Sequence, residues 1–376
     1  MIKSFTVSNF KRIQKPVTID FSKVSNYEFN KECIKDNLIN TAVLLGKNGS
    51  GKSSVVTAMF DIIYNLTDKY IGRNNYTNYL NLTGDSDEAA FKYVFQIMGK
   101  EVVYTYRKRN LTTFIAEKLD IAGETVIKYD RAENDSEFYL NFPETNTLKV
   151  DLKKLDISLV KYVKGNSATG DSEKYKILLE LFDFVEKMLL FWSLEYRSFV
   201  GYSSVSNGDI VEEIISRGHF KNLQNFFKEA GINEEIIHKK IGTEEKLFFK
   251  FANGKELEFS SATCSTGMSS LLLLFYWLAD INSNNERTPS FVCIDEFDAF
   301  YHFELSQLIL NKLKKANCQV LLTTQNTTLL GNDILRPDCY FLFEDEKIAN
   351  LPERTDKELR LVHNIEKLYR GGTFGL

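Results

Sequence analysis

Hydrophobic and polar positions alternate at the start of the chain, which predicts an opening β-hairpin over residues 2–7 and 17–21 with a polar turn at 9–12. An apolar run at 40–45 predicts a buried strand that leads into a Gly-rich loop and then a helix over about 52–66. Further alternating stretches predict two more pairs of antiparallel strands, at 91–97 with 101–107 and at 112–119 with 125–129. The first third of the chain should therefore be rich in antiparallel β-structure.

The pattern changes near residue 130, where helical spacing of apolar residues replaces alternation. Helices are predicted over 174–192 and 210–230, and Gly231 is well placed to end the second. The later elements are predicted as strands at 246–251 and 256–259 with a turn at Asn253-Gly254, a helix over 266–280, and buried strands at 291–295 and 319–325. We therefore expect three parts: an N-terminal half-domain (1–128), a mainly helical insertion (129–244) and a C-terminal half-domain (245–376).

Composition places the chain among ordinary globular proteins. Its 376 residues are 43% hydrophobic and 26% charged with a formal net charge of −4, which argues against wholesale disorder and against a globally basic nucleic-acid binder. The five cysteines are scattered without a Cys-x-x-Cys pair, which indicates reduced cysteines rather than a zinc site. No signal peptide is recognisable, and no apolar run reaches the ~20 residues that span a bilayer. We expect a cytoplasmic protein without membrane contact.

The first chemical motif is a phosphate-binding loop, G-x-x-x-x-G-K-[ST], between the predicted strand at 40–45 and the helix that follows. Its glycines allow backbone N–H groups to close around phosphate oxygens, and the helix N-terminus adds the positive end of its dipole. Lys52 is expected to reach the β- and γ-phosphates, and Ser53 to bind Mg²⁺. The expected ATP-binding residues of this loop are Gly46, Lys47, Asn48, Gly49, Ser50, Gly51, Lys52, Ser53 and Ser54.

A second motif follows the apolar strand at 291–294, which ends in the adjacent carboxylates Asp295 and Glu296. An aspartate at a strand end can bind Mg²⁺, and the next glutamate can polarise the attacking water. In isolation, such a pair more often belongs to a solvated turn. Its combination with a phosphate loop favours the catalytic interpretation, in which Glu296 and Lys52 are catalytic and Asp295 is a metal ligand.

The spacing of the motifs separates the classes of P-loop protein. Asp295 follows Lys52 at too great a distance for a small GTPase or kinase without a large insertion. Ser265 and Gly267, at the start of the helix predicted over 266–280, resemble the signature of ABC ATPases, although an ordinary serine helix cap is the alternative. Gln325 stands where ABC ATPases have a switch histidine. A glutamine can hydrogen-bond a γ-phosphate but cannot carry a proton charge, so hydrolysis involving Gln325 should be slow or partner-stimulated.

Taken together, the motifs resemble the ABC-type AAA ATPases of the SMC-like and OLD-like group, which is common in bacterial phage-defence operons of abortive-infection, Septu or PARIS type. Residues 9–12, 295–302 and 359–372 add to the resemblance at both ends of the chain. It implies an α/β P-loop NTPase fold, namely an ABC-type ATPase head with a mixed central sheet, flanking helices, an antiparallel β part and a helical insertion. It also implies ATP and Mg²⁺ as cofactors and a head-to-head dimer or higher oligomer.

The resemblance assigns further residues. Ser265 and Gly267 would bind the γ-phosphate of the nucleotide held by a second subunit, and Arg12 or Lys11 of the N-terminal hairpin would touch phosphate. Gln96 is a candidate Q-loop ligand of Mg²⁺, although it lies in a strand-like stretch. His302 offers a substitute for the missing switch histidine, but a lone histidine there is more often packed or exposed, which is the favoured interpretation.

Other partners and functions remain as alternatives. Contact with DNA or RNA is an expectation for the local clusters Tyr104–Arg109, Lys239-Lys240 and Lys314-Lys315, each of which is more often a solvated face. The stretch after Gln325 is too short for the TOPRIM nuclease domain of OLD-type proteins, so a nuclease effector should be a separate polypeptide. The favoured function is a dimeric ATP-hydrolysing clamp that regulates such an effector in antiphage defence. The alternatives are a RecF- or SMC-like DNA-repair ATPase and an ATP-binding scaffold with little turnover.

Overall fold

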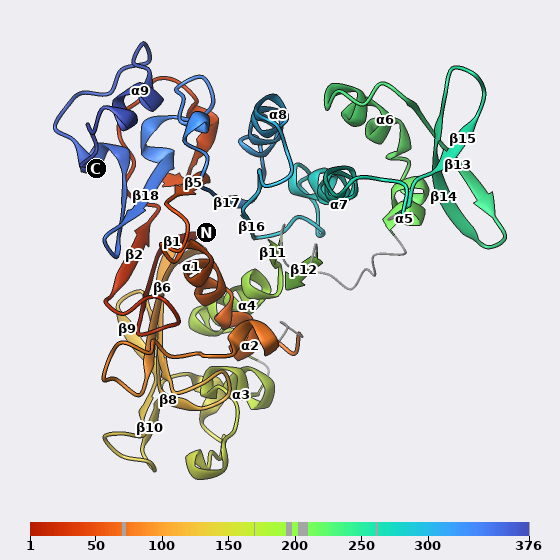
Figure 1. Cartoon of the computed structure of the whole chain (residues 1–376). Helices are drawn as coiled ribbons and strands as arrows, with labels where there is room; N and C mark the ends of the chain where they lie inside the picture. The colour runs from red at the N-terminus through yellow and green to blue at the C-terminus, as the bar shows by residue number, and fades with distance from the viewer. Residues whose placement is uncertain (70–72, 169, 193–197, 202–209, 261, 376) are drawn as a thin grey trace.

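Two seven-stranded sheets dominate the structure (Figure 1). The computed structural model describes residues 1–69, 73–168, 170–192, 198–201, 210–260 and 262–375. The first sheet is antiparallel throughout, and its strands lie in the order β10 (Phe138–Leu140), β9 (Glu124–Asp130), β8 (Phe114–Ile121), β7 (Lys100–Lys108), β6 (Ala89–Ile97), β1 (Ile2–Ser8) and β2 (Val17–Asp20). The three antiparallel pairs predicted from alternation are thereby confirmed.

The second sheet is mixed. Its strands lie in the order β12 (Ser198–Gly201), β11 (Met188–Trp192), β16 (Phe291–Asp295), β17 (Gln319–Thr324), β5 (Thr41–Leu45), β18 (Tyr340–Glu344) and β19 (Lys347–Asn350). The five central strands run parallel, and β12 and β19 pair antiparallel at the edges. Every residue of β5, β11, β16 and β17 is buried, as expected for parallel strands that are covered on both faces. The carboxyl ends of β5, β16 and β17 consequently meet at one edge.

Helices cover the sheets and form part of a projecting lobe. They are α1 (Lys52–Met59), α2 (Asp61–Leu66), α3 (Leu159–Asn166), α4 (Glu173–Glu186), α5 (Ile210–Ser216), α6 (Phe220–Glu229), α7 (Thr266–Ile281), α8 (Phe303–Leu313) and α9 (Ile365–Arg370). Short 3₁₀ turns are η1 (Lys31–Cys33), η2 (Arg73–Tyr76), η3 (Pro143–Thr145), η4 (Leu152–Lys154), η5 (Thr327–Leu329), η6 (Pro337–Cys339) and η7 (Leu351–Arg354). Among the described residues, no helix is both long and apolar enough to cross a membrane.

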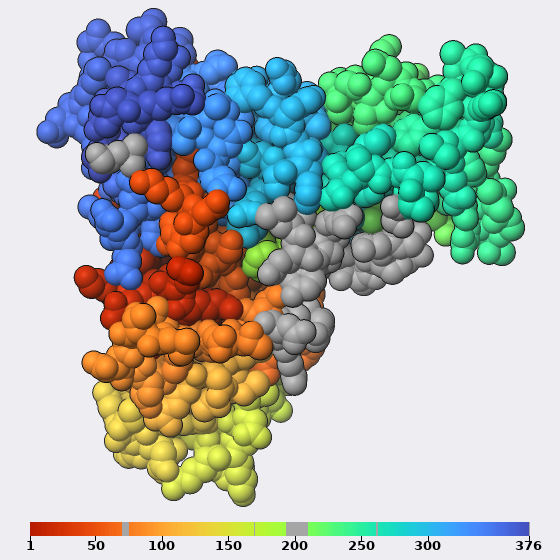
Figure 2. All heavy atoms as spheres, viewed as in Figure 1, coloured from red at the N-terminus to blue at the C-terminus, as the bar shows by residue number. Residues whose placement is uncertain are grey.

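Two smaller sheets also occur in the described part of the chain. One is the pair β3 (Ile34–Lys35) and β4 (Leu38–Ile39), and the other contains β13 (Glu235–Ile241), β14 (Glu244–Lys250) and β15 (Glu256–Glu258). The lobe formed by α5, α6 and β13–β15 projects from the body, and α7 lies between the lobe and the mixed sheet (Figure 1). The space-filling view has an L-shaped outline for this reason (Figure 2). The helix that would carry the signature is therefore also the helix nearest the lobe.

The helix predicted over 174–192 is wrong in its last part. α4 ends at Glu186, and Met188–Trp192 instead forms β11, which pairs parallel with β16. A continuous run of apolar residues suits a central strand as well as a buried helix, so periodicity alone does not distinguish them. The helix predicted over 210–230 is likewise divided into α5 and α6, with Gly218 in a left-handed conformation between them. The helix predicted over 52–66 is interrupted at Phe60.

The segment predicted as a mainly helical insertion has mixed structure. It contains α3–α6, as expected, but also β10, β11, β12 and β13. β10 extends the antiparallel sheet, and β11 lies within the mixed sheet beside β16. Residues 129–244 therefore contribute to the central architecture, while the boundaries between the three parts stay a prediction.

Candidate functional site

The Gly-rich loop joins the carboxyl end of β5 to the N-terminus of α1. Gly49 and Gly51 have φ angles of 75° and 107°, which a residue with a Cβ rarely adopts. A Cβ on Gly46 would lie 2.8 Å from Ser50 Oγ and 3.0 Å from the carbonyl oxygen of Phe343. Among the residues that the structure describes, no side chain caps α1, and the first turn of this helix carries no acidic residue. The loop therefore leaves the N-terminus of α1 open to an anion.

Lys52 lies folded into this loop. Its side chain is only 5% exposed, and its Nζ donates to the carbonyl oxygens of Gly46 at 2.6 Å and Lys47 at 3.1 Å. Burial lowers the pKa of Lys52, whereas the carboxylates of Glu296 and Asp295 act in the opposite direction. The structure thus brings together the predicted lysine and the predicted pair of carboxylates, although their motifs are far apart in the sequence.

Asp295 and Glu296 occupy the end of β16 with a fixed geometry. Asp295 is 5% exposed, and its Oδ1 accepts a hydrogen bond from Thr323 Oγ1 at 2.6 Å. Glu296 has a φ angle of 49°, a conformation that costs energy in a residue other than glycine. Burial and the neighbouring Asp295 raise the pKa of Glu296, whereas Lys52 lowers it. A glutamate with a raised pKa beside a phosphate loop is suited to polarising a water molecule.

Two threonines at the carboxyl end of β17 complete this edge and were not predicted. Thr323 Oγ1, besides bonding Asp295, accepts the backbone N–H of Glu296 at 2.8 Å. Thr324 Oγ1 donates to Asp298 Oδ1 at 2.7 Å. The only sign of them in the sequence was two consecutive threonines at the end of a buried strand. That sign becomes informative only when β17 is known to lie beside β16.

Gln325 and Arg12 reach the same region from different elements. Gln325 follows β17 directly and is exposed. Arg12 Nη1 donates to the carbonyl oxygen of Gly49 at 3.4 Å, while Lys11 Nζ donates to the carbonyl oxygen of Thr77. Of the two basic residues considered from the sequence, Arg12 is therefore the one whose side chain contacts the phosphate loop.

The candidate signature turn begins α7. Ser265 is the N-cap residue, and its Oγ accepts the N–H of Met268 at 3.3 Å, so the helix-cap alternative is correct as a description of the isolated chain. A Cβ on Gly267 would lie 3.1 Å from the carbonyl oxygen of Phe300, which shows how closely the loop after β16 approaches this turn. Within the described ranges, neither Ser265 nor Gly267 hydrogen-bonds the phosphate loop of the same chain.

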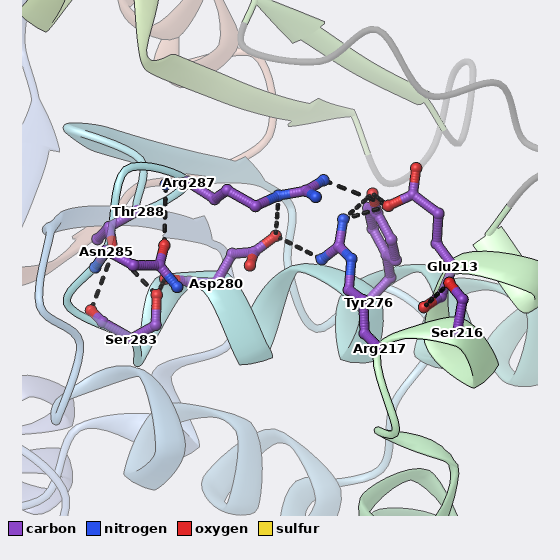
Figure 3. A network of polar contacts seen from close by, with 9 residues as sticks. All are labelled: Glu213, Ser216, Arg217, Tyr276, Asp280, Ser283, Asn285, Arg287 and Thr288. Carbon is purple, nitrogen blue, oxygen red and sulfur yellow. Dashed lines mark hydrogen bonds and ion pairs between the residues drawn. The ribbon is translucent and has the colours of Figure 1, made fainter.

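A network of polar side chains fastens α7 to the lobe (Figure 3). Glu213 Oε2 accepts a hydrogen bond from the Tyr276 hydroxyl at 2.7 Å and pairs with Arg217. Arg217 also donates to Asp280 Oδ2 and to the Tyr276 hydroxyl, both at 3.0 Å. Arg287 contacts Glu213 and Asp280 from the loop after α7. α5 and α7 are thus joined by charged contacts as well as by apolar packing.

Gln96 lies elsewhere, so the structure does not support it as a metal ligand. Its backbone N–H donates to the carbonyl oxygen of Met1 at 2.8 Å, and the adjoining Ile2 N–H donates to the side chain of Gln319. Gln319 begins β17, whereas Gln325 follows the opposite end of that strand. β6 therefore places Gln96 in the antiparallel sheet, near the start of β17 and away from the carboxyl end of β17 where Gln325 lies.

His302 also has a structural role. It is the N-cap residue of α8, where its Nδ1 accepts the N–H of Leu305 at 3.1 Å, and its side chain is 65% exposed. This agrees with the favoured interpretation of an ordinary exposed histidine.

Half of the aromatic and basic cluster at 104–109 lies in the core and is closed to nucleic acid. Tyr104, Tyr106 and Lys108 are fully buried, and Arg107 pairs with Glu88 and Asp130. The two lysine clusters are also neutralised in part: Lys239 pairs with Glu256, and Lys314 is largely buried and pairs with Glu32. Because side chains alternate between the two faces of a strand, half of the residues at 104–109 point into the core. A count of basic residues in the sequence does not reveal this.

Several solved structures resemble the chain, with low sequence identity. An SMC head bound to the C-winged helix domain of ScpA aligns with 14% identity and a TM-score of 0.47, covering 93% of this chain and 97% of that one. The SMC head domain from Thermotoga maritima aligns with 13% identity, a TM-score of 0.43 and the same coverages. An SMC head with an extended coiled coil, bound to a ScpA domain derived from Pyrococcus furiosus, gives 13% identity and a TM-score of 0.44, covering 93% and 95%. No curated protein sequence matches significantly.

The mixed sheet, the phosphate loop after β5 and the carboxylates at the end of β16 form the α/β P-loop NTPase fold, with an antiparallel sheet beside the mixed one. This is the fold expected for an ABC-type head. The family profile described as "AAA domain, putative AbiEii toxin, Type IV TA system" matches residues 42–331, which is more than half of the chain. The chain therefore belongs to this family of AAA domains.

Proposed function

We propose that this protein is an ATPase that binds ATP and Mg²⁺ between two copies of the chain and thereby regulates a separate effector in bacterial antiphage defence. The observation that carries the proposal is the convergence of Lys52, Asp295 and Glu296 at one edge of the mixed sheet. Lys52 is buried in the phosphate loop, and both carboxylates influence its protonation. Such convergence is required for phosphoryl transfer, in which positioning and charge stabilisation do most of the catalysis.

The loop fits a nucleoside triphosphate. The loop 46–51 leads into the uncapped start of α1, and Ser50 Oγ is buried without a hydrogen-bond partner among the described residues. Lys52 Nζ is held by carbonyl oxygens and can turn toward phosphate oxygens instead. Ser53 and Asp295 would hold Mg²⁺, which supplies charge neutralisation of the phosphates when bound. Arg12, next to Gly49, would add a charge-assisted contact.

Hydrolysis would depend on Glu296 and Gln325. Glu296 would polarise the attacking water, and Gln325 would donate a hydrogen bond to the γ-phosphate without taking up a proton. A neutral amide stabilises developing charge less than an imidazolium does, so we expect a low basal rate that a partner raises. The competing proposal is a scaffold that binds ATP with almost no turnover. The glutamine at the switch position, where a histidine is usual, favours this outcome.

The second copy would contribute Ser265 and Gly267. Ser265 is exposed and the first turn of α7 is half-buried, so the helix N-terminus is accessible, which suits it to a phosphate held by another subunit. ATP would then close the dimer by binding both faces, and hydrolysis would release it. The description of the family as a putative AbiEii toxin of a type IV toxin–antitoxin system supports a role in defence, and the nuclease effector remains part of the proposal.

Two variants test the ATPase and its dimer together. We expect wild-type protein to release phosphate from ATP and Lys52→Ala to release none. Glu296→Gln should bind ATP and elute as a dimer in size-exclusion chromatography only when ATP and Mg²⁺ are present. Identical elution of Lys52→Ala and Glu296→Gln with ATP would overturn the clamp, and phosphate release by wild-type protein equal to that of Lys52→Ala would leave only the scaffold.

The regulatory part requires a separate experiment. Co-purification with the product of the adjacent gene, followed by a nuclease assay with and without ATP, should show an ATP-dependent change in nuclease activity. An ATPase that instead responds to gapped or broken DNA without any adjacent effector would favour the DNA-repair alternative.

A further inference from the structure

The turn that carries Arg12 has an unusual backbone. Asn9 and Lys11 have φ angles of 52° and 49°, which is unfavourable for residues other than glycine. Phe10 and Ile13 exchange both of their backbone hydrogen bonds at 2.8 Å across this turn. Strained turns persist only where the surrounding structure holds them. The position of the Arg12 side chain beside Gly49 therefore depends on whatever holds residues 9–13.

The segment from 76 to 81 holds this turn from one side. Lys11 N–H donates to the carbonyl oxygen of Tyr79 at 3.0 Å, and Asn81 Nδ2 donates to the carbonyl oxygen of Lys11 at 2.7 Å. The ring of Phe10 packs against Tyr76 and Tyr79. This segment thus hydrogen-bonds both backbone polar groups of Lys11 and packs against the side chain of Phe10.

The same segment is anchored to the helices that follow the phosphate loop. The Tyr79 hydroxyl donates to Asp61 Oδ1 at 2.9 Å, where Asp61 is the first residue of α2. The Tyr76 hydroxyl donates to the carbonyl oxygen of Thr57 in α1 at 3.0 Å. Asp61 is itself fixed by Lys108 and by the Tyr106 hydroxyl, each at 2.9 Å. Its side chain and that of Lys108 have no exposed surface.

These contacts form a closed chain of interactions that passes through the nucleotide site. The phosphate loop leads into α1 and then to Asp61, Asp61 bonds Tyr79, Tyr79 bonds the turn, and Arg12 of that turn bonds Gly49 of the phosphate loop. A buried ion pair has few alternative geometries, because moving either charge leaves the other unpaired. This closed chain of interactions therefore gives the turn a fixed position relative to α1.

We infer that Tyr79 and Asn81 are positioning residues, which hold Arg12 against the phosphate loop so that its guanidinium is placed for the nucleotide phosphate. This inference rests on the proposed function as far as ATP is concerned. The inference goes beyond the proposed function because it assigns the preorganisation of Arg12 to residues 76–81, which lie outside the phosphate loop. Preorganised donors bind more tightly because less freedom is lost on binding.

The experiment uses the full chain with Tyr79→Phe, Asn81→Asp and Arg12→Ala. Tyr79→Phe keeps the ring against Phe10 and removes only the bond to Asp61, and Asn81→Asp keeps the acceptor that Thr83 uses and removes the donor to Lys11. Tyr104→Phe is the matched control, because Tyr104 is also buried, keeps its ring in this variant, and gives its hydroxyl to Glu117 rather than to Asp61. The readouts are the Kd for a fluorescent ATP analogue with Mg²⁺, hydrogen exchange of residues 9–13 without nucleotide, and thermal stability.

We expect Tyr79→Phe and Asn81→Asp to weaken analogue binding by about threefold to tenfold, which corresponds to the loss of one hydrogen bond. Neither change should weaken binding further when Arg12 is already alanine, since both act through Arg12. The amides of residues 9–13 should exchange faster in both variants. Tyr104→Phe should lower thermal stability but leave both binding and the exchange of residues 9–13 unchanged.

The outcomes separate the two proposals. Additive losses in the Arg12→Ala background, or unchanged exchange of residues 9–13 in both variants, would overturn the positioning role even if ATP binds. If wild-type protein does not bind the analogue, the proposed ATPase fails, and faster exchange at residues 9–13 would still support the structural link to Arg12.

Discussion

Thr323 Oγ1 donates a hydrogen bond to Asp295 Oδ1 at 2.6 Å and, from the other side, accepts the backbone N–H of Glu296. One hydroxyl group therefore fixes a buried carboxylate and the strained backbone of the residue proposed to polarise water. The bond forms because β16 and β17 are parallel neighbours whose carboxyl ends are in register. The chemistry proposed for Glu296 thus depends on a residue of a different strand.

Thr323→Val is the first prediction. Valine keeps the shape of the side chain but leaves the buried Asp295 without this donor, so we expect a loss of about 1.5–3 kcal/mol in the free energy of unfolding. Phosphate release should fall at least about tenfold, because the orientation of Glu296 is no longer fixed. Thr323→Ser, which keeps the hydroxyl, is the control. Urea denaturation and phosphate release measure the two effects, and equal activity of Val and Ser variants would contradict the role.

The second prediction concerns pH. Burial and Asp295 raise the pKa of Glu296 above its ordinary value of 4.5, so the folded protein holds this proton more tightly than the unfolded chain. Stability from this group is therefore present below pH 4.5 and is lost as the pH rises through the raised pKa. Glu296→Gln should stabilise the protein at neutral pH, and the gain should vanish in acid. Thermal unfolding between pH 4 and pH 8 measures the difference, and a gain independent of pH would contradict it.

The third prediction concerns the buried ion pair of Lys108 and Asp61. Lys108→Met should cost about 3–5 kcal/mol in the free energy of unfolding, because it leaves a buried carboxylate without its cation. Adding Asp61→Asn should recover much of that loss, since the remaining amide carries no charge. Urea denaturation of both single variants and the double variant gives the coupling. If the double variant is as unstable as the sum of the single variants, the two residues do not act as a pair.

The fourth prediction tests whether one site is built from two copies. Lys52→Ala and Gly267→Val should each abolish phosphate release, the second because its side chain would collide with the carbonyl oxygen of Phe300, 3.1 Å from an added Cβ, and block the turn. In a mixture, some dimers combine an intact phosphate loop of one subunit with an intact signature turn of the other. Activity should therefore return on mixing. A mixture that stays inactive, although both variants are folded by circular dichroism, would contradict the shared site.

The fifth prediction concerns the network between α5 and α7. Arg217→Gln removes the charge that joins Glu213 and Asp280, and a partly buried pair of this kind contributes about 1–3 kcal/mol. The amides of α5 should exchange faster, while those of the antiparallel sheet should not change. Glu304→Gln, an exposed acid at the start of α8, is the control. Equal exchange of α5 in both variants would show that apolar packing alone holds the lobe.

Local patterns were sufficient for the elements whose signal is contained in a few neighbouring residues. The alternating strands of the antiparallel sheet, the strand before the phosphate loop and the helix capped by Ser265 were predicted correctly, because alternation, turn residues and caps act over short distances. The end of the helix predicted over 174–192 was not, because Met188–Trp192 becomes a strand only through its pairing with β16. A buried apolar run carries no local mark of that partner.

The sequence by itself determined the phosphate loop, the carboxylates Asp295 and Glu296, and the order of the elements that carry them, since each of these is a matter of residue type and local spacing. The tertiary structure decided which other residues join them. It brought Thr323 to Asp295 and Arg12 to Gly49, and it placed Gln96 in the other sheet, near the start of β17. It also buried Lys108 with Asp61 in the core. The physical reason is that hydrogen bonds and ion pairs between distant segments depend on strand pairing and burial, which arise only when the whole chain packs.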